Sequence, residues 1–525
     1  MSRTMPLPAA VGCRSVPGSG GSWAEHARPA GCTRGSYPRG CGRGGVAYLM
    51  PACAAHRTRR RIGFSSQSVR PACGAPSAEE VRPVTTPTEG QKIVAERYLA
   101  EAVAAAARIT GLADTVAPRP IARVAVIGAG TMGSGIAMAF ADGGLPVTLV
   151  EQNSEALDRG IATIGRTYES SAAKGRITAE QAQERIASIE PNLDFAAVAD
   201  ADLVVEAVFE DMDVKKDVFG RLDALCTPGT ILASNTSRLD LDEIARSTSR
   251  PQDVIGLHFF SPAHVMKLVE VVRGDATADD VIATAMDLAT TIGKVPVLAK
   301  VCEGFIGNRM LTPYRREADF LLEEGASPQQ IDGALRAFGL AMGPFAMADL
   351  AGNDISWAAR KRLAPTRPKD LRYSRVADTL CEAGRFGQKT GAGYYRYEQG
   401  SRTPIPDPIV DDIIRTCAQE DGIERRTITD EEIVDRCILA LVNEAAALLG
   451  DGIAQRPSDI DVVYTHGYGF PKDRGGPMHY AENIGLDVVL TKIREFEKTH
   501  GRVWTPAPLL VDRVEGNHST CSAGR

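Results

Sequence analysis

The sequence contains no apolar run of about 18 residues that could cross a membrane, no surplus of positive charge and no Cys-x-x-Cys motif. Its net charge is −6 at pH 7, so no overall positive field favours nucleic acid or anionic lipid. The cysteines after residue 80 show no metal-ligand spacing with histidine. We therefore expect no membrane contact, no nucleic-acid partner, no metal site, and free thiols in a reducing compartment such as the cytosol.

Residues 1–88 lack the apolar periodicity of a folded domain. The first 78 residues contain eleven Arg, no Lys and one acidic residue, with many Gly, Pro and Ser. This composition predicts a disordered, low-complexity extension. An organelle transit peptide is one alternative, and it would place the protein in an organelle matrix instead of the cytosol. Translation from a start codon upstream of the true one would give the same bias, and we favour that interpretation.

The remaining sequence changes character twice, as expected for a 525-residue chain of several domains. Residues 89–121 begin Ala-rich and helix-favouring and end near two prolines, which is typical of a linker helix. In residues 122–300, β-branched runs are mostly separated by helical stretches, which indicates a mainly parallel sheet covered on both faces. The segments expected as strands are RVAVIG, PVTLVE, DLVVEAV, TILASN, VIGLHFF, KLVEVV and VPVLAK.

Two later regions, residues 301–400 and 425–505, are helical in pattern and repeat each other. NRMLTPYRREADFLLEEGA in the first aligns with DRCILALVNEAAALLGDGI in the second, and Ile-Asp and Gly-Pro matches follow in the same order. Two amphipathic helices can be alike by chance, but the ordered matches favour duplication. We expect an α/β domain followed by two tandem all-α domains, with residues 506–525 as a tail.

The stretch VAVIGAGTMGSGIA places Gly128, Gly130 and Gly133 between a strand and a helix. In a dinucleotide-binding loop the first glycine permits the tight turn, the second lets the backbone approach a pyrophosphate, and the third allows close helix–strand packing. The next strand ends at Glu151, whose carboxylate can accept hydrogen bonds from a ribose and would repel a 2′-phosphate. The spacing predicts a Rossmann-like domain that binds NAD in preference to NADP.

Three polar residues accompany the later strands. Ser237 follows TILASN, His258 ends VIGLH, and Glu270 lies in the middle of KLVEVV. Ligands of such sheets bind beyond the carboxyl ends of the strands, and a hydride-transferring enzyme needs a base for the substrate's hydroxyl proton. Each residue alone is more often structural: a core histidine, a loop serine or a solvent-facing glutamate.

Five motifs, in this order, resemble the 3-hydroxyacyl-CoA dehydrogenase family: GAGTMGSGIA, ASNTS, HFFSPAHVMKLVEVV, EGFIGNRM and GQKTGAGYY. The resemblance covers about residues 92–505. It implies that His258 is the catalytic base and that Glu270 fixes its tautomer and stabilises imidazolium. It also implies that Ser237 hydrogen-bonds the reacting oxygen and that Asn308 binds the substrate's carbonyl oxygen. A helix-capping role is the alternative for Asn308.

The same resemblance implies further contacts with the ligands. Cofactor contacts are expected at Met132, Glu210, Lys215, Ser237 and Lys389, and a substrate contact at His466. Surface salt bridges are the alternative for the charged side chains, and a structural role is the alternative for the histidine.

The activity that the resemblance implies is NAD-dependent oxidation of (S)-3-hydroxyacyl-CoA to 3-oxoacyl-CoA in fatty-acid β-oxidation. The linker helix and the second helical copy resemble the dehydrogenase half of multifunctional β-oxidation enzymes. The low-complexity N-terminal residues are too few to form the enoyl-CoA hydratase domain of those relatives, so a hydratase or thiolase is a candidate partner. Two other functions remain open: a dehydrogenase of a small 3-hydroxy acid or sugar acid, and a catalytically idle NAD-binding structural protein.

The second helical copy is not expected to form a second active site. Asp435 stands at the position equivalent to Asn308, and no NAD-binding domain directly precedes this copy. Family members with one copy are dimers joined through the helical domain. The apolar face of IVDRCILALVNEAAALL predicts a helix that packs on the first copy in place of a partner subunit, so we expect a monomer.

Overall fold

The computed structural model describes residues 86–113 and 115–522. The predicted disordered extension therefore lies, up to residue 85, outside the described residues. The first element is helix α1 (Glu89–Ala106), which begins at a capping box formed by Thr88 and Gln91. The linker helix was expected within residues 89–121, whereas α1 ends at Ala106, and the described residues between it and β1 form no further helix.

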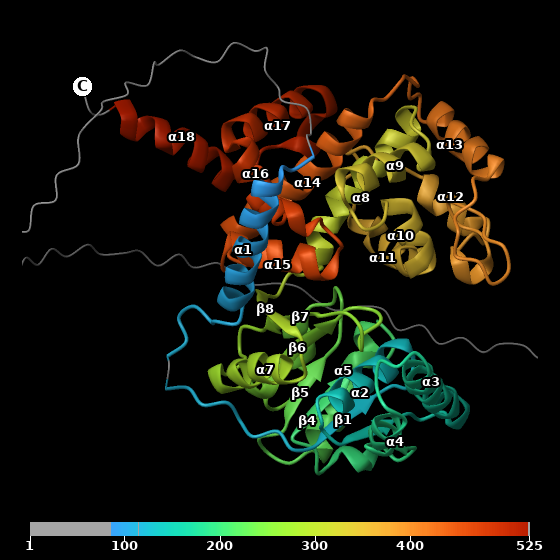
Figure 1. The fold of residues 1–525 in the computed structure, drawn as a ribbon, viewed down its shortest axis with the longest axis vertical. Helices are drawn as coiled ribbons and strands as arrows, with labels where there is room; N and C mark the ends of the chain where they lie inside the picture. The colour runs from blue at the N-terminus through green and yellow to red at the C-terminus, as the bar shows by residue number, and fades with distance from the viewer. Residues whose placement is uncertain (1–85, 114, 523–525) are drawn as a thin grey trace, which may run out of the picture. The chain divides into compact units, whose positions relative to one another are not determined.

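One eight-stranded sheet forms the centre of the α/β region, in the order β3-β2-β1-β4-β5-β6-β7-β8. Figure 1 labels β1 and β4 to β8 of this sheet. Its strands are β1 Val124–Ile127, β2 Val147–Val150, β3 Ile189–Asn192, β4 Leu203–Glu206, β5 Ile231–Ser234, β6 Val254–Phe259, β7 Leu268–Arg273 and β8 Val295–Lys300. Every residue of β1, β4, β5 and β6 is buried, as expected for strands covered on both faces.

Helices accompany these strands as the alternating pattern predicted. They are α2 Thr131–Asp142, α3 Ser154–Ala173, α4 Ala179–Ala187, α5 Met212–Leu225, α6 Leu241–Ala245 and α7 Asp279–Thr291. Each expected strand is present. The sequence did not predict β3, an edge strand containing Pro191 in which only Ile189 is buried, because it carries little of the apolar signal of a central strand.

The direction of β7 positions the site. β1 to β6 run parallel, whereas β7 is antiparallel to β6 and parallel to β8. The register between β6 and β7 places Glu270 directly opposite His258. Side chains of directly opposed residues lie on the same face of a sheet, so this pairing brings the two side chains together.

The described residues after Val301 form helices and isolated β-bridges only. The helices are α8 Gly307–Glu324, α9 Pro328–Phe338, α10 Pro344–Ala351, α11 Asn353–Leu363, α12 Val376–Glu382, α13 Pro408–Glu420, α14 Asp430–Gly450, α15 Pro457–Gly467, α16 Pro477–Ile484, α17 Leu486–His500 and α18 Pro508–Ser522. The expected C-terminal tail thus contains helix α18, because buried Leu510 packs with apolar side chains of α14 and α17.

Each of the two helical segments contains the same arrangement of hydrogen bonds around one aspartate. Asp332 accepts hydrogen bonds from two backbone N–H groups at the start of α10, both at 3.0 Å. Asp461 does the same at the start of α16, at 2.7 and 3.1 Å. A tyrosine hydroxyl completes each arrangement: Tyr395 lies 2.8 Å from Asp332, and Tyr98 of α1 lies 2.6 Å from Asp461. Equivalent contacts at aligned positions support the duplication.

Among the described residues, no helix is long and apolar enough to cross a membrane. The same part of the chain contains no group of His, Cys, Asp and Glu that could hold a metal ion.

Candidate active site

A cleft of about 830 Å³ opens at the carboxyl ends of the parallel strands. Its lining includes most of the residues singled out from the sequence, which are Gly128, Gly130, Met132, Glu151, Glu210, Ser237, His258 and Asn308. All but the last come from the α/β domain. Asn308 comes from α8, so the first helical copy contributes to the same cleft.

The glycine-rich loop fits a dinucleotide. Gly128 has a φ of +99°, and a Cβ there would lie 2.7 Å from the carbonyl oxygen of Ala207. A Cβ on Gly133 would overlap the carbonyl of Gly128, so close packing of α2 on β1 requires glycine. No side chain caps the N-terminus of α2, whose N-cap is Gly130. Its backbone N–H groups can therefore bind a pyrophosphate.

Glu151 lies where β2 ends, beside this loop. One carboxylate oxygen accepts a hydrogen bond from Ala129 N and the other accepts one from Asn153 N, both at 3.1 Å. These bonds hold the carboxylate at the wall of the cleft, where it can accept further hydrogen bonds from ribose hydroxyls.

His258 and Glu270 form a buried pair. His258 Nδ1 lies 2.7 Å from Glu270 Oε2, and the two residues are 6% and 0% exposed. The other glutamate oxygen accepts hydrogen bonds from the backbone N–H groups of Ile306 (3.1 Å) and Gly307 (2.9 Å) at the start of α8. A carboxylate fixed in this way requires a proton on Nδ1, which leaves Nε2 as the ring's acceptor.

Ser237 is held by Glu210, which belongs to a chain of charged side chains that continues through Lys215 to Glu206. Glu210 accepts hydrogen bonds from Ser237 N (2.7 Å) and Ser237 Oγ (3.1 Å). Lys215 lies 3.3 Å from Glu210 and 2.7 Å from buried Glu206. Burial alone would raise the pKa of Glu210, but the charge of Lys215 and hydrogen bonds from Ser237 and Thr236 hold it below its usual value.

Three side chains that were predicted to contact the ligands do not line the cleft. Lys215 is only 1% exposed and its ammonium lies between two glutamates, so it positions Glu210 from below. Lys389 pairs with Asp354 in the helical region, at 2.5 Å, and is not among the residues that line the cleft. His466 is also outside that lining. Its Nδ1 lies 3.1 Å from Val462 O within α15, and burial lowers its pKa.

The aromatic residues of the cleft were not predicted as ligand contacts, and two of them lie in contact with each other. Phe260 and Tyr468 both line it, and their rings meet edge-on with centroids 5.5 Å apart. Phe260 lies in the HFF motif, directly after the strand that carries His258. Tyr468 lies two residues after His466 in THGYGFP, and the substrate contact at His466 stays a prediction.

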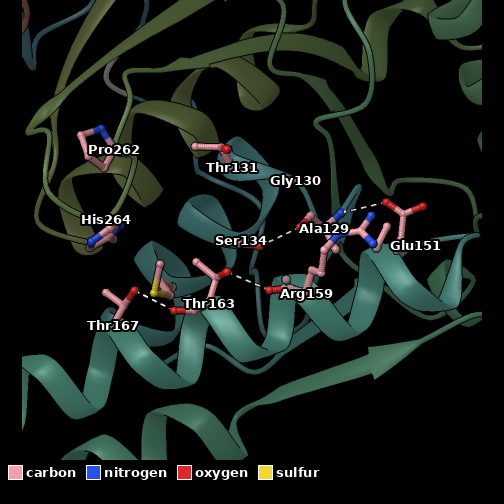
Figure 2. A pocket seen from close by; sticks show the side chains of 13 residues that line it. Ala129, Gly130, Thr131, Ser134, Glu151, Arg159, Thr163, Thr167, Pro262 and His264 are labelled. Atoms are coloured by element: carbon pink, nitrogen blue, oxygen red, sulfur yellow. Dashed lines mark hydrogen bonds between the residues drawn. The ribbon is translucent and has the colours of Figure 1, made fainter. Parts of the chain in front are cut away.

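A second cavity of about 370 Å³ adjoins the glycine-rich loop, and it shares Gly130, Thr131 and Glu151 with the cleft. In Figure 2, Arg159 of α3 lies on the side of Glu151, while His264 of the β6–β7 loop lies on the opposite side. Burial lowers the pKa of His264. The glycine-rich loop therefore contributes residues to the lining of both cavities.

Comparison with protein families gives two matches that together cover most of the described chain. Residues 123–302 match 3-hydroxyacyl-CoA dehydrogenase, NAD binding domain. Residues 304–397 and 433–525 match 3-hydroxyacyl-CoA dehydrogenase, C-terminal domain. The boundary between the matches lies just before α8, and the two helical segments match the same domain family.

Curated relatives include the peroxisomal bifunctional enzymes of Cavia porcellus and Homo sapiens. They are 48% and 45% identical over 396 residues, which is 73% of this chain and 54% of each relative. The chain thus spans about half the length of the curated relatives it matches.

Similar solved structures include 3-hydroxybutyryl-CoA dehydrogenase from Escherichia coli, with a TM-score of 0.67 and 30% identity over 77% of this chain and 100% of that chain. The dehydrogenase part of multifunctional enzyme 1 from C. elegans has a TM-score of 0.59 and 29% identity, over 81% of this chain and 96% of that chain.

Proposed function

Because the chain belongs to the 3-hydroxyacyl-CoA dehydrogenase family, we propose that it oxidises (S)-3-hydroxyacyl-CoA to 3-oxoacyl-CoA in fatty-acid β-oxidation. The observation that carries the proposal is the pair of His258 and Glu270, at 2.7 Å, in the cleft that also contains the glycine-rich loop. Gly128, Gly130 and Glu151 would hold NAD there, which would supply the hydride acceptor for oxidation at C3 of the substrate.

His258 takes the proton of the substrate's hydroxyl group through Nε2. Glu270 holds the Nδ1 proton and stabilises the imidazolium that forms, because a carboxylate beside the ring favours its charged state. Since two backbone N–H groups at the start of α8 bind the same glutamate, the helical domain helps to fix the base in place.

Ser237 and Asn308 bind the substrate's two oxygens in this proposal. Ser237 Oγ, held near Glu210, hydrogen-bonds the reacting oxygen at C3. Asn308 Nδ2 lies 3.3 Å from Ser237 O, so the amide is close to the same position and donates to the thioester carbonyl oxygen. The cofactor is held by Gly128, Gly130, Met132, Glu151 and Glu210, which line the cleft.

The two alternative functions make different predictions. A dehydrogenase of a small 3-hydroxy acid or sugar acid would oxidise the free acid as well as its CoA thioester. An idle NAD-binding protein would bind NADH and oxidise neither. The buried His258–Glu270 pair at a cleft favours an active enzyme, since a buried carboxylate beside a histidine ring costs desolvation and adds little stability by itself.

NADH formation from 3-hydroxyacyl-CoAs of four to sixteen carbons tests the proposal, with free 3-hydroxybutyrate as the comparison. We expect turnover of at least one thioester and little turnover of the free acid. Equal turnover of acid and thioester would favour the small-acid dehydrogenase, and NADH binding without any turnover would favour the idle protein.

The second helical copy, in our proposal, packs on the first and replaces a partner subunit, so the protein is a monomer. We further infer a cytosolic location, with an organelle matrix as the alternative, since the relatives above are named peroxisomal enzymes. A hydratase or a thiolase remains a candidate partner, because a hydratase would form the substrate of this reaction and a thiolase would consume its product.

A further inference from the structure

Tyr468 belongs to the second helical copy, yet it lines the cleft that contains His258, Ser237 and Asn308. It is the first residue after α15. The second copy therefore contributes a side chain to the active site built by the α/β domain and the first copy. This matters because that copy is not expected to carry a site of its own.

Several contacts fix the ring of Tyr468. It stacks on Tyr464 with centroids 4.9 Å apart and meets Phe260 edge-on. Tyr464 in turn donates a hydrogen bond to the carbonyl oxygen of Gly307, at 3.1 Å. A Cβ on Gly307 would overlap the ring of Tyr468, so the start of α8 can approach the tyrosine only with glycine at this position.

Two contacts together fix the orientation of the Asn308 amide. Ser237 O can only accept a hydrogen bond, so the group 3.3 Å from it must be the NH₂ of Asn308. The amide oxygen then faces Tyr468, whose hydroxyl lies 3.0 Å away and donates to it. Burial and the charge of Glu270 raise the pKa of Tyr468 well above its usual value, so the hydroxyl stays a donor.

We propose that Tyr468 is a positioning residue for the dehydrogenase reaction, which orients the Asn308 amide so that its second N–H faces the substrate's carbonyl oxygen. The inference rests on the proposed function. An amide with its oxygen turned toward that carbonyl would repel it, because both groups are acceptors. By holding Oδ1, Tyr468 keeps the donor side of the amide in the cleft.

The test is Tyr468→Phe, which retains the ring and removes only the hydroxyl. Loss of one hydrogen bond to a neutral group should lower kcat/KM for 3-hydroxybutyryl-CoA about 3- to 10-fold. The Kd of NADH should be unchanged, since Asn308 is assigned to the substrate. Tyr373→Phe is the matched control: it removes a part-buried tyrosine hydroxyl that bonds Asp378, and neither of these residues lines the cleft. Its kcat/KM should stay near that of the wild type.

A double-mutant cycle with Asn308→Ala separates this role from general packing. If Tyr468 acts through the amide, Tyr468→Phe should cause no further loss of kcat/KM in the Asn308→Ala protein. An equal loss in both backgrounds, or a wild-type value for Tyr468→Phe alone, would overturn the inference while wild-type turnover upholds the proposed function. Absence of wild-type turnover with every thioester would overturn both.

Discussion

Arg309 of α8 and Glu444 of α14 form an ion pair with a separation of 2.6 Å between Nε and Oε1. The residues at the aligned positions of the other copy, Arg436 and Glu317, form the reciprocal pair at 2.9 Å. Reciprocal contacts are characteristic of a two-fold interface, in which each partner uses the same patch. Here both patches lie in one chain, so the contact of α8 with α14 has the form of a subunit interface.

Truncation near residue 425 should therefore cause self-association. Removal of α14 would expose the face of α8 that it covers, and exposed apolar patches of this kind promote association between molecules. Light scattering on the intact and truncated proteins measures the outcome, and the intact protein should be a monomer. A truncated protein that is monomeric, soluble and fully active would show that the second copy does not replace a subunit.

Replacement of His258 by Gln should lower turnover by roughly 100-fold or more, because the side chain can no longer accept the hydroxyl proton. NADH binding, measured by fluorescence, should stay nearly intact. His500→Gln on α17 serves as a control for loss of a histidine elsewhere. Near-normal turnover of the His258→Gln protein would rule out the mechanism.

Cofactor choice should depend on Glu151. Glu151→Ala removes the acceptor for the ribose hydroxyls and the charge that repels a 2′-phosphate. The kcat/KM for NAD should therefore fall by roughly 10-fold or more, and the ratio of kcat/KM for NAD to kcat/KM for NADP should decrease. Glu169→Ala, which removes an exposed acid of the neighbouring α3, should leave the kcat/KM values for NAD and NADP unchanged. A wild-type enzyme that prefers NADP would contradict the assignment of Glu151.

Acid stability should depend on Glu324. Burial alone would raise its pKa, but hydrogen bonds and charge from Arg436 and Arg372 lower it to about 2. Because the pKa is depressed in the folded state, the stabilisation is present above the ordinary value near 4.5 and is lost as the pH falls toward 2.

Glu324→Gln should therefore lower the free energy of unfolding at neutral pH by roughly 3 kcal/mol and make its decline between these pH values shallower. Urea unfolding at a series of pH values measures both effects. Glu398→Gln, at an exposed position, is the control. Equal slopes for Glu324→Gln and the wild type would show that this carboxylate does not contribute to acid unfolding.

The sequence by itself determined the local features of this protein. Glycine spacing, an apolar strand and an acid at the end of the next strand predicted the dinucleotide loop, since each of these signals is read within about 30 residues. Alternating apolar runs predicted the central strands, and the family resemblance carried by the motif around His258 and Glu270 predicted that these two side chains meet, as they do in the structure. The family resemblance added Ser237 and Asn308, which lie at the same cleft.

Only the tertiary structure decided how distant groups meet. The antiparallel register of β7 placed Glu270 opposite His258, and packing buried Lys215 between Glu206 and Glu210. Tyr468 reaches Asn308 across 160 residues of sequence. No local periodicity encodes such a contact, because it depends on the packing of α15 against α8 and not on either helix alone.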